Sequence, residues 1–444
     1  MKKITNKKTF HHYLYFLLGQ QFSMLGSMIV GFVISWYFAS NVIYLSISVT
    51  LMFLPQVIIP AFSGVIADRW NKKLIIAISD SAQALLTFLL FIFFLLDIQS
   101  VAFILTINTF RAASYAFQYP TVQSLIPTMV PKEQLSRING LNFLSSGFIF
   151  AVGPMIAASL MFLIPQTEMI FLLDIITFLI AIVPLVIIKI PEVQQTTEET
   201  VKKSMYKDFK TGLLTIKLVP GLMAMIVFAM IWNFISRPWM VLLPNFIYGI
   251  HGGTAFNLAL LTTSGQVGNI IGSLITTYKK TWHHKIKINI IGAALFFICQ
   301  IPAILAPTGN YMLMIISLFP GWVLFPITVS TYLAILQVVV PKDKIGRVMS
   351  IDHMISMAIA PIGSILSGPL ALLFGIRTLF LIAAILGVIH PFLIWFFTKI
   401  RQLEIIEREI MLKTEEEKVE EKEEGKVEEI TRPTEVIQII EPIE

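Results

Sequence analysis

Long apolar stretches alternate with short polar segments along most of the chain. A helix needs about 20 mostly apolar residues to cross the roughly 30 Å hydrocarbon core of a bilayer. Twelve stretches reach that size, near residues 10–40, 42–66, 74–96, 101–130, 138–164, 169–190, 219–248, 254–278, 286–306, 311–340, 348–374 and 378–397. The pattern predicts an all-α integral membrane protein with twelve transmembrane helices, six on each side of a polar segment.

The composition excludes a string of water-soluble domains. Of the 444 residues 56% are hydrophobic and 14% are charged, with a mean hydropathy of +0.79, whereas soluble domains average about 45 to 50% apolar and about 25% charged residues. The single cysteine, Cys299, excludes an intrachain disulfide and a zinc site built from several cysteines. His283 and His284 have no carboxylate or cysteine at ligand spacing, so we expect no metal.

Positive charge is distributed in a way that predicts the topology. If the N-terminus is cytoplasmic, 30 of the 33 Lys and Arg residues fall in the cytoplasmic segments and only Arg377 falls in an outer loop. The positive-inside rule then places both termini in the cytoplasm of a cell with the protein in its plasma membrane. The cations stand between apolar spans, so membrane topology explains them and no nucleic-acid partner is expected.

The polar segments divide the chain into four parts. Residues 1–190 and 218–398 are the predicted six-helix bundles, joined by a cytoplasmic linker at 191–217 and followed by an acidic tail at 399–444. The second half of the linker has the pattern of a basic amphipathic helix at the membrane surface, with a plain tether as the alternative. The tail is predicted to be solvated and partly helical or disordered, and a docking role remains open.

The two bundles resemble one another in sequence. The segment at 130–137, Val-Pro-Lys-Glu-Gln-Leu-Ser-Arg, recurs 210 residues later at 340–347 as Val-Pro-Lys-Asp-Lys-Ile-Gly-Arg. The Trp-Asn-Lys-Lys-Leu segment at 70–74 is echoed 212 residues later by Trp-His-His-Lys-Ile. These nearly equal offsets indicate a duplication, with a pseudo-two-fold axis along the membrane normal and a substrate path between the halves.

The loop between the second and third spans has the most specific motif. It reads Gly64-Val-Ile-Ala-Asp68-Arg69-Trp-Asn71-Lys72-Lys73 and resembles the cytoplasmic signature of the major facilitator superfamily, G-x-L-A-D-R-x-G-R-K. We expect Asn71, in place of the second glycine, to adopt the left-handed conformation. The resemblance implies that Asp68 contacts the start of the eleventh span and that the motif, Gly64, Asp68, Arg69, Lys72 and Lys73, forms a cytoplasmic gate.

Several charged residues lie inside predicted spans, where an ionisable group is costly and is a functional hypothesis by default. Arg111 is similar to an arginine that the superfamily associates with proton coupling, and Asp174, Asp80 and Asp352 are the candidate carboxylates. For Asp80, which follows a basic loop closely, we favour a structural ion pair with Arg69 or Lys73.

Span 5 carries Gly147-Phe-Ile-Phe-Ala-Val-Gly153-Pro154-Met-Ile-Ala-Ala, which is similar to the antiporter motif G-x-x-x-G-P-x-x-G-G. Small residues permit close packing and Pro154 bends the helix, so the alternative is a kink without directional meaning. The stretch from Arg111 to Asn139 and the residues around Asp174 resemble the macrolide-efflux and siderophore-exporter branch of drug:proton antiporters. Residues that could line an apolar cavity are Gln20, Met24, Trp232, Asn233 and Arg237.

We therefore predict a monomeric secondary active transporter that exports a lipophilic drug-like or siderophore-like small molecule by alternating access. The resemblance implies that the proton gradient is its energy source and that no cofactor is needed. The absence of a Walker sequence argues against ATP. Proton-coupled uptake of a metabolite and a transport-inactive membrane sensor are the alternatives. Catalysis is not expected, since no nucleophile, base and third group occur together at an aqueous face.

Overall fold

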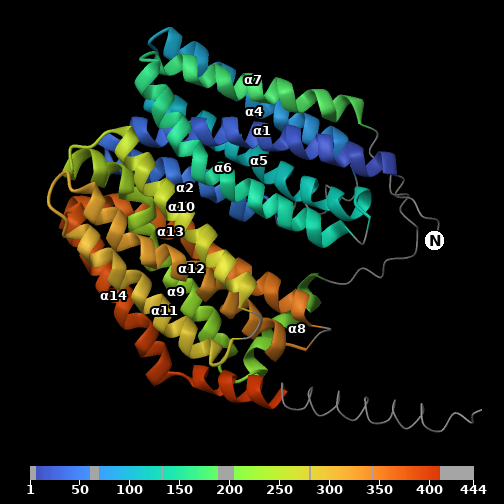
Figure 1. Ribbon diagram of the computed structural model, residues 1–444, viewed down its shortest axis with the longest axis vertical. Coiled ribbons are helices and arrows are strands. Elements are labelled where there is room, and N and C mark those ends of the chain that lie inside the picture. The colour runs from blue at the N-terminus through green and yellow to red at the C-terminus, as the bar shows by residue number, and fades with distance from the viewer. Residues whose placement is uncertain are drawn as a thin grey trace, which may run out of the picture.

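The computed structural model describes residues 7–60, 70–131, 134–188, 205–279, 282–341 and 344–410. Within these residues twelve helices of 17 to 31 residues form two groups of six (Figure 1). The first group consists of α1 (Lys7–Tyr37), α2 (Val42–Ile58), α4 (Lys72–Leu95), α5 (Val101–Met129), α6 (Leu135–Leu163) and α7 (Thr167–Ile187). The second consists of α9 (Leu222–Asn245), α10 (Ala255–Tyr278), α11 (Lys285–Ile304), α12 (Tyr311–Val339), α13 (Ile345–Phe374) and α14 (Ile376–Phe397).

The prediction of an all-helical fold with twelve long helices is confirmed. Ten of these helices are long and apolar enough to span a membrane, and α2 is a shorter apolar helix of 17 residues. The remaining helix, α5, carries Asn108, Arg111 and Gln118, all of them buried. Polar side chains of this kind lower the hydropathy of a segment without preventing it from crossing the bilayer, provided that they face protein.

The helices run back and forth, so the polar connections collect at two ends of the molecule. One end carries Lys72, Arg137, Lys279, Lys285 and most other described cations, and we call it the basic end. The opposite end, the far end, carries Arg377. In Figure 1 the start of α1 and the helix α8 (Met205–Leu218) lie at the basic end.

The two groups of six helices repeat the same neighbour relations. In the first half α4 packs on α5 and α7, and in the second half α11 packs on α12 and α14. Likewise α1 contacts α6 and α7 as α9 contacts α13 and α14, and α2 packs on α5 as α10 packs on α12. Between the halves α2 packs on α13, and α6 packs on α10. This exchange of equivalent partners is the arrangement that a pseudo-two-fold axis produces.

The halves are joined at the far end. A single apolar core there contains Val33 and Leu45 of the first half together with Leu242 and Phe380 of the second. Polar contacts reinforce it, because the Asn245 side chain donates to the Ala39 carbonyl at 2.6 Å. At the basic end, by contrast, each half has a core of its own, around Tyr13 and Leu125 in the first half and around Ile226 and Val348 in the second.

The start of α4 differs from the expectation for the motif loop. Asn71 does not adopt the left-handed conformation: its φ of −63° and ψ of 112° are extended, and its side chain accepts hydrogen bonds from the backbone of Lys73 and Leu74. Asparagine at this position is therefore a helix N-cap, which satisfies two backbone donors that have no partner within the helix. The glycine-like role assigned to it was wrong.

The linker and the tail both pack against the second half. Helix α8 lies on α13, where Gly212 lies close to Ile351, so the second half of the linker is helical as predicted. Its position at the membrane surface stays a prediction. After α14 the chain continues through η4 (Lys399–Arg401) into a helical segment that ends the described residues. Leu403 is fully buried there, and Glu407 forms a buried ion pair with Lys285. Residues 399–410 thus belong to the second half, and the rest of the predicted tail lies outside the described residues.

Candidate functional site

A buried ion pair links two of the intramembrane charges that the sequence singles out. The Arg111 Nη2 atom of α5 lies 3.0 Å from the Asp174 Oδ2 atom of α7. Arg111 is 6% exposed and Asp174 is 3% exposed. Both residues lie on the far-end side of the middle of their helices, so the pair is held inside the first half, away from the aqueous ends.

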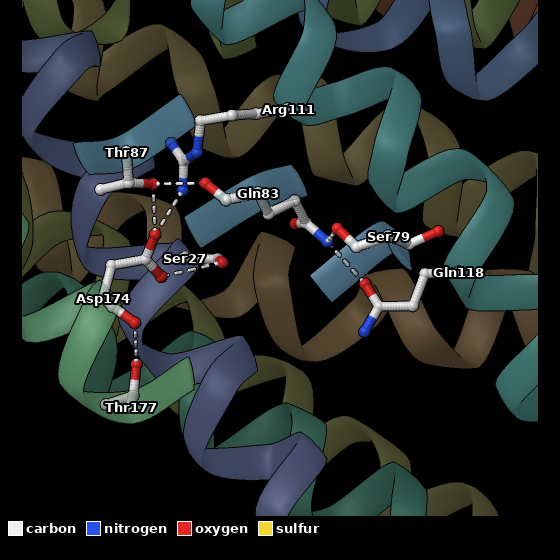
Figure 2. A network of polar contacts seen from close by, with 8 residues as sticks. All are labelled: Ser27, Ser79, Gln83, Thr87, Arg111, Gln118, Asp174 and Thr177. Atoms are coloured by element: carbon white, nitrogen blue, oxygen red, sulfur yellow. Dashed lines mark hydrogen bonds and ion pairs between the residues drawn. The ribbon is translucent and has the colours of Figure 1, made fainter. Parts of the chain in front are cut away.

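Two hydroxyl groups complete the surroundings of Asp174 (Figure 2). Thr87 of α4 donates to Asp174 Oδ2 at 2.6 Å, and Ser27 of α1 donates to Oδ1 at 3.1 Å. The carboxylate therefore receives hydrogen bonds from three helices besides its own. This matters because burying an unpaired ion costs several kcal/mol even after the protein relaxes around it. The cost is offset only if the ion is paired and its remaining lone pairs accept hydrogen bonds.

Glycine at position 26 creates the space for this arrangement. A Cβ atom built there would lie 2.1 Å from the Thr177 Oγ1 atom and 2.9 Å from the Asp174 Cα atom. No side chain fits between α1 and α7 at that distance. The close approach of the two helices thus depends on a single small residue.

A second carboxylate belongs to Asp80 of α4. Asp80 precedes Thr87 by seven residues at 1.5 Å per residue, so it lies about 10 Å from Thr87 along the helix, towards the basic end. It is 1% exposed and accepts hydrogen bonds from two amides, Gln20 of α1 at 3.0 Å and Gln118 of α5. No cation contacts it within the described residues, and Arg69 lies outside them.

Lys73, one of the two partners predicted for Asp80, points elsewhere. Its Nζ atom donates to the backbone carbonyls of Val186 and Ile188 at 2.7 and 2.8 Å. A cation at the C-terminus of α7 satisfies carbonyls that have no partner in the helix and interacts favourably with the helix dipole. The predicted ion pair between Asp80 and Lys73 was therefore wrong. Lys72 similarly reaches the Ser124 carbonyl of α5, at 3.5 Å.

Glutamine side chains connect the two carboxylates. Gln83 donates to Gln118 at 2.7 Å, and Gln118 donates to Gln20 and Asp80. At its other end Gln83 accepts, through its backbone carbonyl, from the Thr87 hydroxyl that also contacts Asp174. Figure 2 shows this row of side chains running from Asp174 to Gln118. We call these residues the polar row: Ser27, Gln20, Asp80, Gln83, Thr87, Arg111, Gln118 and Asp174.

The sequence contained a signal for the residues that were missed. Asp80, Gln83 and Thr87 are three and four residues apart, so they share one face of α4 inside an apolar span. Gln118 follows Arg111 by seven residues and shares its face of α5 in the same way. Two polar stripes of this kind in neighbouring spans predict a contact between them.

The other predicted residues lie apart from this row. Gly64, Asp68 and Arg69 are outside the described residues. Asp352 of α13 accepts a hydrogen bond from the Tyr332 hydroxyl of α12, in the second half. Gly153, beside Pro154, lies against Met28, which would be 2.9 Å from a Cβ atom at position 153.

Of the residues predicted to line a cavity, Gln20 belongs to the polar row and Met24 is half-buried on α1. Trp232 packs against Phe296 and Phe297 of α11 inside the second half, with ring centroids 5.1 and 4.7 Å away. Asn233 accepts from Arg237 at 3.4 Å, one turn along α9. Whether these residues contact a substrate stays a prediction.

Comparison with known proteins agrees with this architecture. The family model described as Major Facilitator Superfamily matches residues 15–360. Macrolide efflux protein A of Streptococcus pyogenes is 24% identical over 401 residues, which cover 87% of this chain and 96% of that protein. The staphyloferrin A transporter of Staphylococcus aureus is 22% identical over 413 residues, covering 90% and 98%.

Among solved structures, a bacterial homologue of the iron transporter ferroportin in an inward-facing state superposes with a TM-score of 0.67 at 14% identity, covering 86% of this chain and 98% of that one. This likeness shows the fold, and the family model identifies a multi-pass membrane transport protein that carries a small molecule. The chain belongs to the Major Facilitator Superfamily.

Proposed function

We propose that the protein is a proton-coupled exporter of lipophilic small molecules that works as a monomer by alternating access. The names of two relatives, a macrolide efflux protein and a staphyloferrin A transporter, support export. The repeat supports the proposed monomer, because in such folds the substrate path lies between the two halves of one chain. The proton gradient is the proposed energy source.

The observation that carries the coupling is the buried pair of Arg111 and Asp174. A proton that reaches Asp174 neutralises the carboxylate and leaves Arg111 as a buried cation without a counter-charge. That state is costly, so α5, which carries Arg111, shifts relative to α7. Because α5 packs on α2 and α2 packs on α13 of the other half, the shift is transmitted to the boundary between the halves.

Asp80 is the proposed second proton site. It lies on the basic-end side of the polar row and is held by amides rather than by a cation. Burial of a carboxylate without a counter-ion disfavours its charged form. We propose that Asp80 exchanges protons with the aqueous phase at the basic end of the molecule. Asp174, at the other end of the polar row, then takes up or releases a proton in turn.

The structure corresponds, in this proposal, to the state open towards the cytoplasm. Positive charge gathers at the basic end, which the positive-inside rule places in the cytoplasm. The halves share one core at the far end and have separate cores at the basic end. This supports the inward-facing state, as in the superposed ferroportin homologue.

Reconstitution tests the coupling. The purified protein is placed in liposomes with an internal pH dye, a gradient is imposed, and macrolides, siderophores and other lipophilic compounds are screened for substrate-dependent proton movement. We expect Asp174→Asn and Arg111→Ala each to abolish proton movement. Asp352→Asn tests the candidate carboxylate of the other half, and it should retain proton movement if the coupling resides in the first half. If both first-half variants transport normally, the coupling assignment is wrong.

The two alternative functions give different results in the same preparation. Uptake predicts substrate movement in the direction opposite to export under the same gradient. A sensor predicts that deleting residues 411–444 removes its output, whereas an exporter keeps most of its flux. The deletion begins at 411 because residues 399–410 pack against the second half.

A further inference from the structure

Arg237 of α9 is a buried cation without a counter-charge in the part of the chain that the structure describes. It is 4% exposed, and its Nε atom is buried without a hydrogen-bond partner. Its contacts are a 3.4 Å hydrogen bond from Nη2 to the Asn233 side chain and the Phe53 ring of α2, whose centroid is 5.1 Å from the guanidinium carbon. Neither partner carries a charge.

No carboxylate is within reach among the described residues. Asp80 and Asp174 belong to the polar row of the first half. Asp352 is the carboxylate on α13, the helix that packs against Arg237, but it precedes the contact residue Gly363 by 11 residues, or about 16 Å along the helix. The guanidinium therefore keeps its full charge in an apolar setting, which a transport protein tolerates at a functional position.

Packing does not require an arginine at this position. A Cβ atom at Gly363 of α13 would lie 2.8 Å from the Arg237 Cγ atom, and a Cβ atom at Gly153 of α6 would lie 2.9 Å from the Met28 Cγ atom. Gly153 and Gly363 are 210 residues apart, and Met28 and Arg237 are 209 apart. The same helix contact in the first half thus accommodates methionine.

Arg237 is 4% exposed in this structure, and a ligand would reach it when the two halves move apart in the proposed alternating access. Phe53, whose ring it faces, belongs to the other half of the molecule, so the guanidinium lies at the boundary between α2 and α9. Trp239 and Leu242, the next inward-facing residues of α9, already belong to the core that joins the halves at the far end. Arg237 therefore lies where the joint core ends and the boundary towards the basic end begins.

We propose that Arg237 binds the carboxylate of an amphipathic organic acid, and that the transported substrate class is an anionic lipophile rather than a cation. This rests on the proposed transport function and specifies its substrate. The planar guanidinium pairs with a carboxylate through two parallel hydrogen bonds. Phe53 covers the cation when no acid is bound, and the neighbouring aromatic and aliphatic side chains accept the apolar body of the ligand.

Matched ligands test this proposal without a proton gradient. The full-length protein in detergent is titrated with dansyl-glycine, dansyl-valine, dansyl-leucine and dansyl-phenylalanine, each compared with its primary amide, while dansyl fluorescence reports binding. We expect at least one acid to bind at least tenfold more tightly than its amide. Arg237→Met should reduce that acid to the affinity of its amide and leave the amide unchanged. Arg237→Lys should retain part of the preference.

A stability measurement and a second variant test whether a loss of acid binding has a merely structural cause. Arg237→Met should unfold at the same or a higher temperature, because Met28 fills the equivalent contact. Phe53→Leu keeps the guanidinium and should keep the tenfold preference for the acid. The proposal is overturned if no acid outbinds its amide, if Arg237→Met retains the preference, or if Phe53→Leu abolishes it. Failure here leaves the coupling roles of Arg111 and Asp174 intact, since those are measured by proton movement.

Discussion

The two halves of the protein have the same helix contacts but hold their buried arginines differently, because Arg111 is paired with a carboxylate and Arg237 is not paired among the described residues. In the first half the cation and the carboxylate of the pair lie 3.0 Å apart, and two hydroxyls satisfy the remaining lone pairs. In the second half Arg237 and Asp352 are separated. Among the described residues, buried polar atoms without a partner occur in both halves, on Gln21 and Arg111 Nε in the first and on residues such as Ser364 and His390 in the second.

This difference extends to the small residues that permit the contacts. Gly26 lies opposite Asp174 in the first half; the positions 209 and 210 residues later hold Ile235 and Ala384. The second half therefore forms the same helix contacts with an isoleucine and an alanine at these two positions. The comparison teaches that the duplicated scaffold needs none of these charges, so each is free to serve transport.

The largest loss of stability should come from leaving the arginine of the first half without a counter-charge, as Arg237 is among the described residues of the second half. Asp174→Asn leaves Arg111 buried without a counter-charge, and breaking a buried pair costs about 3 to 5 kcal/mol. Chemical unfolding of the detergent-solubilised protein measures the loss. The double variant Arg111→Met with Asp174→Asn should recover a substantial part of it, because the orphaned charge is gone. Equal stability of the single variant and the wild type would contradict the description of a closed pair.

The second-largest loss of stability should come from breaking a buried ion pair of the second half, which lies at the basic end. Glu407 and Lys285 are both buried, so Glu407→Gln should cost about 3 kcal/mol. Glu404, which pairs with the exposed His284, is the control on the same helical segment. Glu404→Gln should cost less than about 1 kcal/mol. Similar losses in the two variants would show that residues 399–410 do not pack as a fixed part of the second half.

Glycine substitutions should have a moderate effect. Gly26→Ala places a methyl group against Asp174 and Thr177, and overpacking of this kind costs about 1 to 3 kcal/mol. Gly31 lies on the same helix with no atom within 4 Å of a Cβ atom, so Gly31→Ala should be neutral or stabilising. Unfolding curves of the two variants separate helix propensity from the requirement for close approach. An equally stable Gly26→Ala would show that α1 and α7 can separate without loss.

Much of the fold could be predicted from the sequence, because apolar spans and positive loops are determined by local composition. Even α5, which buries Asn108, Arg111 and Gln118, was predicted as the apolar stretch at 101–130. The duplication was visible in two loop segments, and the structure adds the paired helix contacts that extend it into the spans.

The site could be predicted only in part, because its contacts join residues far apart in the sequence. Arg111 and Asp174 were both identified, but they are 63 residues apart and nothing local showed that they touch. Asp80 was assigned to Arg69 or Lys73 because both cations are close to it in sequence. The choice between a carboxylate and the free carbonyls at the end of α7 depends on how α4 and α7 pack, which local sequence does not contain.

The smallest effect should come from His251 in the far-end loop of the second half, another buried group whose hydrogen-bonding atoms are not all paired. Burial lowers its pKa, and the nearby charge of Arg377 lowers it further. The folded protein therefore binds a proton at His251 less readily than the unfolded chain does. Its stabilising contribution is complete above the unfolded pKa of 6.5 and is lost as the pH falls below that value.

We expect the unfolding midpoint to fall between pH 7.5 and pH 5 by on the order of 1 °C on account of this group. His251→Gln should remove that part of the pH dependence, and Arg377→Gln should reduce it. A wild-type midpoint that rises on acidification, with His251→Gln showing no such rise, would mean that the loop holds a protonated histidine and that the sign argued here is wrong.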